Sequence, residues 1–278
     1  MALLDLVSPW AAAIDAPESA TAQGVYRSRH DALLESLRLQ RAPHAHELPL
    51  ADSHADLRRQ AGRVADAEWQ QRLRDTVARA AAAGADLPVV VALLAGDDSG
   101  DVTEPLPADA PMVALFVERG NDAVLHVALA TALATLTRWC APDSESRVWR
   151  PGTPTWDRWD RARDVPLAEW VYAEGVGVHL AAALFSEVEP HRLLGVSRGA
   201  FHRLRERERL LRGLLAEELP QAGLGLVVRW LAPGAPRSAR TLGGQVIPPG
   251  AGRYLGWRMS ADRIARVGVS DALRMQAE

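Results

Sequence analysis

The sequence predicts a mainly α-helical α+β fold, and three observations support this class. Apolar residues recur at helical spacing over several long segments. Two short apolar runs, 88–95 and 112–118, are bounded by Gly, Asp and Pro, which is typical of strands. The segment 122–139 is apolar nearly all round, so we expect a helix that is buried on every side.

The first third of the chain is expected to be helical. Leucines lie at helical spacing in 27–41, and residues 53–83 are typical of one or two further helices that end at Gly84. We therefore expect an N-terminal helical region over 1–87 and a core over 88–278, built together as one compact unit.

The core is expected to begin with the two strands. The segment between them is rich in Gly, Asp and Pro, which predicts a loop. Helix 122–139 follows, and then a Pro- and Trp-containing loop over 141–165. Pro166 suits the first turn of the next helix, 166–186. The remaining segments are expected to be a helix at 198–218 with Ser197 as N-cap, a loop at 232–251, a helix at 253–266 and a short helix from Ser270.

Composition excludes several classes of protein. The 278 residues are 48% hydrophobic and 24% charged, which is typical of a globular chain. The net charge of -3 argues against a nucleic-acid partner. We see no apolar run near the ~20 residues of a membrane span and no basic leader, so we expect a cytoplasmic protein without membrane contact. One cysteine, Cys140, excludes a disulfide framework.

The chain contains no lysine, so all 32 basic residues are arginines. Codon bias in a GC-rich genome explains this composition, but its chemical consequence holds either way. A Schiff-base lysine and a P-loop lysine are both excluded, so an anion must be held by arginine or by backbone N–H groups. No Gly-rich nucleotide loop and no G-x-S-x-G motif is present. We therefore expect no cofactor.

Three motifs appear in the order found in one family of zinc peptidases. They are a strand followed by a buried helix from Met112 to Trp139, the tetrapeptide Glu174-Gly175-Val176-Gly177, and the closing run GRYLGWRM from Gly252 to Met259. This order resembles the gluzincins, in particular the predicted zinc-dependent proteases of the domain-of-unknown-function 2268 type. The resemblance implies a zincin-like core in which a small sheet, with an edge strand at 112–118, and a buried active-site-type helix pack on the helix that carries the EG pair.

The zinc-binding motif of that family is missing. An HExxH helix places two histidines on one face to share a zinc ion. The matching pentapeptide here is Thr131-Ala132-Leu133-Ala134-Thr135, so both histidines and the catalytic glutamate are replaced. The resemblance leaves Glu174, at the third-ligand position, as the one remaining ligand. We therefore expect no bound metal and no classical zinc peptidase activity.

Glu174 is the first candidate catalytic residue. A carboxylate on an apolar helix in a metal-free cleft should have a raised pKa and act as a general base. The alternative is a structural glutamate that is paired with an arginine. Thr131 and Thr135 lie one turn apart and should line the same pocket, where they either bind a substrate or bond to their own helix. His126 is a candidate substrate-binding residue, or else a buried core histidine.

Tryptophans and arginines are interleaved between residues 139 and 170, in and beside the loop that precedes the EG helix. They are Trp139, Trp149, Trp156, Trp159 and Trp170, with Arg147, Arg150, Arg158, Arg161 and Arg163. They form either a rim that binds an anionic ligand, with Arg158 and Trp170 as substrate-binding candidates, or a loop anchored by aromatic packing and balanced by aspartates. The resemblance places Arg253 and Tyr254 near the cleft, as a substrate-binding and a catalytic residue.

Two functions follow as hypotheses. The first is a metal-independent enzyme that was repurposed from a zinc-peptidase fold. It would use a carboxylate and arginine cleft for proton transfer, cyclisation or displacement on a small anionic metabolite, in bacterial specialised metabolism. The alternative is an inactive pseudo-peptidase that serves as a binding or scaffold subunit for a protein partner. A surviving peptidase with unusual ligands is a third, weaker hypothesis.

Overall fold

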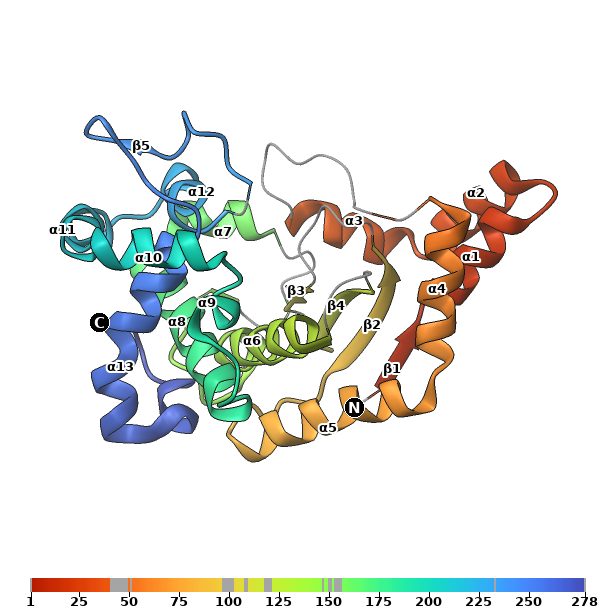
Figure 1. Ribbon diagram of the computed structural model, residues 1–278, viewed down its shortest axis with the longest axis horizontal. Helices are drawn as coiled ribbons and strands as arrows, with labels where there is room; N and C mark the ends of the chain where they lie inside the picture. Colours follow the sequence, from red (N-terminus) through yellow and green to blue (C-terminus); the bar gives the residue numbers. More distant parts are fainter. Residues whose placement is uncertain are drawn as a thin grey trace.

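The computed structural model describes residues 2–40, 50, 52–96, 103–107, 110–117, 122–146, 148–149, 152, 157–232 and 234–277, without the side chains of residues 39 and 40. These residues form thirteen helices, a mixed four-stranded sheet and a two-stranded sheet (Figure 1). The predicted class, a mainly helical α+β protein, is therefore confirmed.

The larger sheet has the strand order β1-β2-β4-β3. The strands are β1 (Ala2–Asp5), β2 (Val90–Ala95), β4 (Met112–Val117) and β3 (Thr103–Leu106). The first three are parallel, and β3 runs antiparallel to β4 at the edge. The predictions for β2 and β4 are confirmed. The strand expected at the edge, β4, is instead internal.

Strand β3 lies inside the segment that was predicted as a loop, so that prediction is wrong for 103–106. Its residues alternate in burial, with Glu104 and Leu106 buried. Pro105 lacks a backbone donor and suggests a loop, yet it is tolerated here because β3 has β4 as its strand partner on one side only.

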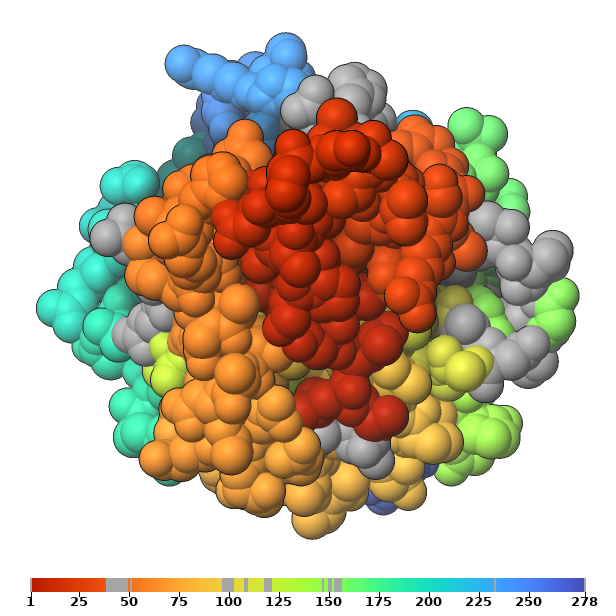
Figure 2. All heavy atoms as spheres, turned by 90° about the vertical axis from the view of Figure 1, so that its right-hand side faces the viewer, coloured from red at the N-terminus to blue at the C-terminus, as the bar shows by residue number. Residues whose placement is uncertain are grey.

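The described N-terminal residues form the helices α1 (Val7–Asp15), α2 (Ser19–Arg29), α3 (Asp31–Gln40), α4 (His54–Ala65) and α5 (Ala67–Ala82). Helices α1 and α4 pack against β2, and α3 packs against β3. Together with β1, these helices make up much of the face shown in Figure 2. The helix expected at 27–41 is broken at His30, which has non-helical backbone angles. Asp66 separates α4 from α5 and caps α5 by accepting hydrogen bonds from two backbone N–H groups. Gly84 ends α5 with φ 103, as predicted.

Helix α6 (Asp122–Cys140) forms the centre of the core, as predicted. It packs against α8 (Leu167–Leu184), α5, β3 and β4. Among the described residues it is the one helix whose length and hydropathy would allow it to cross a membrane, but 83% of that apolar stretch is buried inside the protein. It is therefore a core helix.

Glycines bring α8 into close contact with two other helices. A Cβ on Gly175 would lie 2.2 Å from the backbone of Gly256 in α13 (Ala251–Ala272). A Cβ on Gly177 would lie 2.8 Å from the Thr131 methyl group in α6. The predicted packing of the helix that carries Thr131 against the helix that carries Glu174 is therefore confirmed.

The C-terminal half contains several elements that the sequence did not indicate. They are α7 (Arg158–Asp164), α9 (Pro190–Leu193), α12 (Leu224–Leu231), β5 (Thr241–Leu242) and β6 (Gln245–Val246). Helix α7 lies in a predicted loop and is capped by the Asp157 side chain. The helix predicted at 198–218 is divided at Arg207 into α10 (Arg198–Glu206) and α11 (Glu208–Glu218). Gly268, with φ 81, kinks α13 between the two predicted closing helices.

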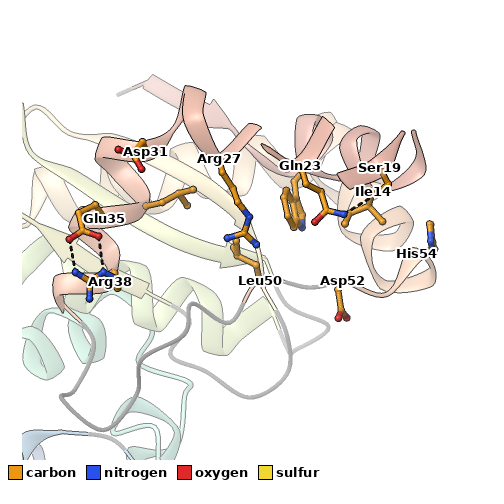
Figure 3. A pocket seen from close by; sticks show the side chains of 12 residues that line it. Ile14, Ser19, Gln23, Arg27, Asp31, Glu35, Arg38, Leu50, Asp52 and His54 are labelled. Atoms are coloured by element: carbon orange, nitrogen blue, oxygen red, sulfur yellow. Dashed lines mark hydrogen bonds and ion pairs between the residues drawn. The ribbon is translucent and has the colours of Figure 1, made fainter. Parts of the chain in front are cut away.

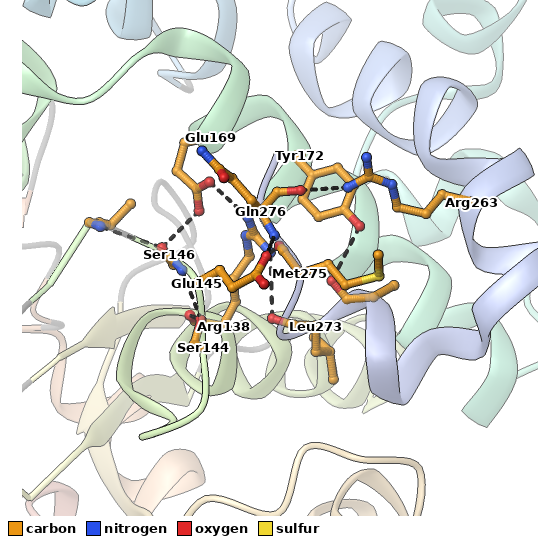
Figure 4. A network of polar contacts seen from close by, with 12 residues as sticks. Arg138, Ser144, Glu145, Ser146, Glu169, Tyr172, Arg263, Leu273, Met275 and Gln276 are labelled. Atoms are coloured by element: carbon orange, nitrogen blue, oxygen red, sulfur yellow. Dashed lines mark hydrogen bonds and ion pairs between the residues drawn. The ribbon is translucent and has the colours of Figure 1, made fainter. Parts of the chain in front are cut away.

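A buried polar network joins α6 to α8 and to the C-terminal residues (Figure 4). Arg138 is fully buried and donates to Glu169 over 2.7 Å and to the Met275 carbonyl over 2.5 Å. Ser146 donates to the second oxygen of Glu169 over 2.7 Å. Because a buried arginine needs such partners, this network fixes the end of α6 relative to α8.

Candidate active site

A small cavity of about 120 Å³ lies where β3 meets α6, α8 and α13. Its lining combines carboxylate, guanidinium and hydroxyl groups from segments that are far apart in sequence. The lining residues are Thr103, Glu104, Pro105, Ala128, Thr131, Ala132, Thr135, Trp139, Arg158, Glu174, Leu231 and Arg253. Five of the eight residues expected in the site, namely Thr131, Thr135, Arg158, Glu174 and Arg253, therefore line one cavity.

Glu174 is paired with an arginine. Arg253 donates from Nε to Glu174 Oε2 over 2.7 Å. The contact follows from the crossing of α8 and α13, because Arg253 lies about one turn before Gly256 and Glu174 directly precedes Gly175. The pairing of Glu174 with an arginine, given above as the alternative, is therefore observed. Its second oxygen, Oε1, has no hydrogen-bond partner among the described residues.

Thr131 and Thr135 line the cavity, and both donate their hydroxyl protons to carbonyl groups of α6. Thr131 donates to the Val127 carbonyl over 3.0 Å, and Thr135 donates to the Thr131 carbonyl over 3.1 Å. The alternative in which both threonines bond to their own helix is therefore the one observed. Their oxygens can still accept a hydrogen bond from a ligand.

Arg158 is held between aromatic rings. Its guanidinium carbon lies 5.3 Å from the Trp159 ring centroid and 5.6 Å from that of Trp170. Trp170 in turn packs edge-on against Trp139, with ring centroids 5.6 Å apart. Trp170 thus contacts the guanidinium of Arg158 but does not itself line the cavity. Within the described part of the chain, Arg158 makes no hydrogen bond or ion pair, and its buried Nε lacks a partner.

Tyr254 and His126 point away from the cavity. The Tyr254 hydroxyl donates to Glu208 over 2.5 Å, and burial together with this contact raises the pKa of Tyr254 to about 12. His126 lies on the side of α6 that faces α5, with its Nδ1 2.9 Å from the Thr76 hydroxyl. Burial lowers the pKa of His126. Three other residues expected at the rim, Arg147, Arg150 and Trp156, lie outside the described residues.

Glu104 lines the cavity and was missed in the sequence. Its side chain is buried, at 6% exposure, and alternation along β3 turns it inward with Leu106. The one sequence signal was this short alternation, which the surrounding Gly, Asp and Pro residues concealed. Leu231 was missed because α12 was not predicted.

No group of three His, Cys, Asp or Glu side chains in the described residues is arranged to hold a metal ion. A larger hollow of about 940 Å³ lies beside α1, α2 and α3 (Figure 3). Its lining is mixed in charge: Arg38 is paired with Glu35, and His54 lies 2.5 Å from Asp15. This hollow therefore shows no dominant charge that would select a ligand.

Comparisons with protein-family models, with curated proteins and with solved structures give no match.

Proposed function

We propose that this chain is a metal-independent enzyme that transfers a proton on a small anionic metabolite in the cavity between β3, α6, α8 and α13. The observation that carries the proposal is the cavity itself. A carboxylate with one unpartnered oxygen and an arginine without a described acidic partner, Glu174 and Arg158, line the same small space.

The side chains that line the cavity suggest a separate role for each polar group. Arg253 holds Glu174 through Oε2, which leaves Oε1 without a described partner and available as the base. Arg158 supplies positive charge for the anionic group of the substrate. Thr131 and Thr135 accept hydrogen bonds that orient it. Proton abstraction by Glu174 would serve an isomerisation, an elimination or a cyclisation in which the substrate displaces its own leaving group.

The alternative function, a binding or scaffold subunit, is favoured by one observation. The Glu174–Arg253 ion pair and the hydrogen bonds of the two threonines satisfy most polar groups of the cavity without a ligand. Under this alternative the same side chains would stabilise the crossing of α8 and α13 and would do no chemistry.

The enzyme hypothesis is tested with a mixture of small carboxylic acids incubated with the protein and followed by mass spectrometry. The wild type should convert one or more components into an isomer or elimination product. Glu174→Gln should slow that conversion by ~10²- to 10⁴-fold. Glu208→Gln is the control, since Glu208 also pairs with an arginine, Arg212, but lies outside the cavity. Equal conversion by Glu174→Gln and the wild type would contradict the catalytic role.

A further inference from the structure

Resting on the proposed function, we propose that the ligand of this cavity is a monoanionic carboxylate bound by Arg158, and that Arg253 does not take part in anion binding.

The two arginines of the cavity differ in what they contact. Arg253 is engaged by Glu174 at 2.7 Å, so its charge is compensated. Arg158 lies against Trp159 and Trp170, and within the described part of the chain it forms no ion pair. The two indole rings hold the guanidinium in place without neutralising it. The planar guanidinium group of Arg158, held in this way, is suited to a carboxylate, which accepts two parallel hydrogen bonds from it.

The charge of the cavity selects a monoanion. Its charged side chains are Glu104, Glu174, Arg158 and Arg253. Glu174 and Arg253 neutralise each other, so Arg158 is the cation among the described lining residues that is left to pair with a ligand. A carboxylate matches that single positive charge, whereas a dianion such as phosphate would leave one negative charge unmatched.

The volume limits the part of the ligand that enters. The cavity has a volume of about 120 Å³, well below the roughly 300–1,000 Å³ of pockets that enclose a drug-sized ligand. A carboxylate group with a short carbon chain is of a size that it can admit. We therefore expect the carboxylate end of a larger molecule, or a small acid, to occupy it.

Acetate is the probe for this site, and inorganic phosphate is the comparison. Both are titrated into the full chain above neutral pH at constant ionic strength, and the nine tryptophan indole N–H signals are followed by NMR. Substitutions of Trp159 and Trp170 by Phe identify the two signals that report on Arg158. Acetate should shift these two signals saturably, and phosphate should bind more weakly.

Two substitutions of Arg158 and one control substitution test whether Arg158 binds acetate. Arg158→Gln should weaken acetate by about 10- to 100-fold, and Arg158→Lys, which keeps the charge without the planar guanidinium group, should lie between this variant and the wild type. Arg198→Gln should bind acetate as the wild type does, because Arg198 is exposed and paired with Glu189 outside the cavity. Retained folding of each variant is checked by circular dichroism.

The inference is overturned by an absence of saturable acetate shifts at Trp159 and Trp170, by equal acetate affinity in Arg158→Gln, or by phosphate binding more tightly than acetate. These results are distinguishable from failure of the proposed function. Acetate binding through Arg158 without any substrate conversion would retain the binding site and reject the enzyme. Conversion that is lost in Glu174→Gln, without acetate binding at Arg158, would retain the enzyme and reject this assignment.

Discussion

Gly175 and Gly256 lie in backbone contact where α8 and α13 cross. A Cβ on Gly175 would be 2.2 Å from the Gly256 carbonyl oxygen, and a Cβ on Gly256 would be 2.1 Å from the Val171 carbonyl oxygen. Real Cβ atoms do not approach this closely, so both positions require glycine. The crossing also places Arg253 against Glu174, so one backbone contact positions the charged pair of the cavity.

Gly175→Ala should therefore destabilise the protein, by about 1–3 kcal/mol or more, because the backbone atoms that it meets cannot move aside as a flexible side chain would. Gly213→Ala in α11 is the matched control. A Cβ there meets no atom within 4 Å, and alanine in an open helical position should stabilise by up to ~1 kcal/mol. Urea unfolding of both variants measures the difference. Two variants of equal stability would show that the helices cross less closely than described.

The buried pair of Arg138 and Glu169 should be far more important for stability than the surface pairs. Glu169→Gln leaves the fully buried Arg138 without its charge partner, so we expect a loss of about 3–5 kcal/mol. Glu189→Gln removes an exposed partner of Arg198 and should have little effect. Chemical denaturation of the two variants tests this contrast, and similar small losses in both would refute it.

Acidification through the ordinary histidine pKa of 6.5 should destabilise the protein. Burial lowers the pKa of His126 and of His179 below the ordinary value of 6.5. The unfolded chain therefore takes up protons first as the pH falls through 6.5, and stability declines until the pH passes the lower folded values. The lowered pKa of Glu208 acts only below its ordinary value of 4.5. His126→Gln should reduce the loss of unfolding free energy across this interval, and an unchanged slope would argue against a buried neutral His126.

The purified protein should contain no stoichiometric zinc, and chelators should leave its unfolding temperature unchanged. The positions that match the two histidine ligands are Thr131 and Thr135, whose hydroxyl protons are donated to their own helix. One carboxylate, itself paired with Arg253, is a poor site for zinc. Elemental analysis measures the zinc content of the purified protein. One zinc ion per chain would contradict this prediction, because it would require ligands other than Thr131, Thr135 and Glu174.

The helices that form the site could be predicted because each contains a sequence pattern that is recognisable without the structure. The apolar segment of α6, the EG pair of α8 and the closing run of α13 together indicated which helices pack, and the structure brings Thr131, Glu174 and Arg253 to one cavity. For His126 the alternative of a buried core histidine is the one observed, since it lies against Thr76 of α5 and outside the cavity.

Side-chain direction and short elements could not be predicted. Arg253 and Tyr254 are neighbours on α13, so their side chains diverge by about 100°, and only Arg253 reaches the cavity. The sequence does not show which of the two faces inward, because that depends on the crossing at Gly256. Glu104 was missed because a four-residue edge strand that contains Pro105 has the composition of a loop.

The most direct test of the account measures turnover and unfolding free energy on Glu174→Gln, beside Glu208→Gln. Glu174, 17% exposed, loses its pairing with Arg253. Glu208, 23% exposed, loses its pairing with Arg212 and Arg258 and weakens its contact with the Tyr254 hydroxyl, so Glu208→Gln should lose at least as much stability as Glu174→Gln. If Glu174 is the base, turnover falls by ~10²- to 10⁴-fold in Glu174→Gln and stays near the wild-type value in Glu208→Gln. Full turnover in Glu174→Gln, together with a large loss of stability, would contradict the account and show that Glu174 is structural.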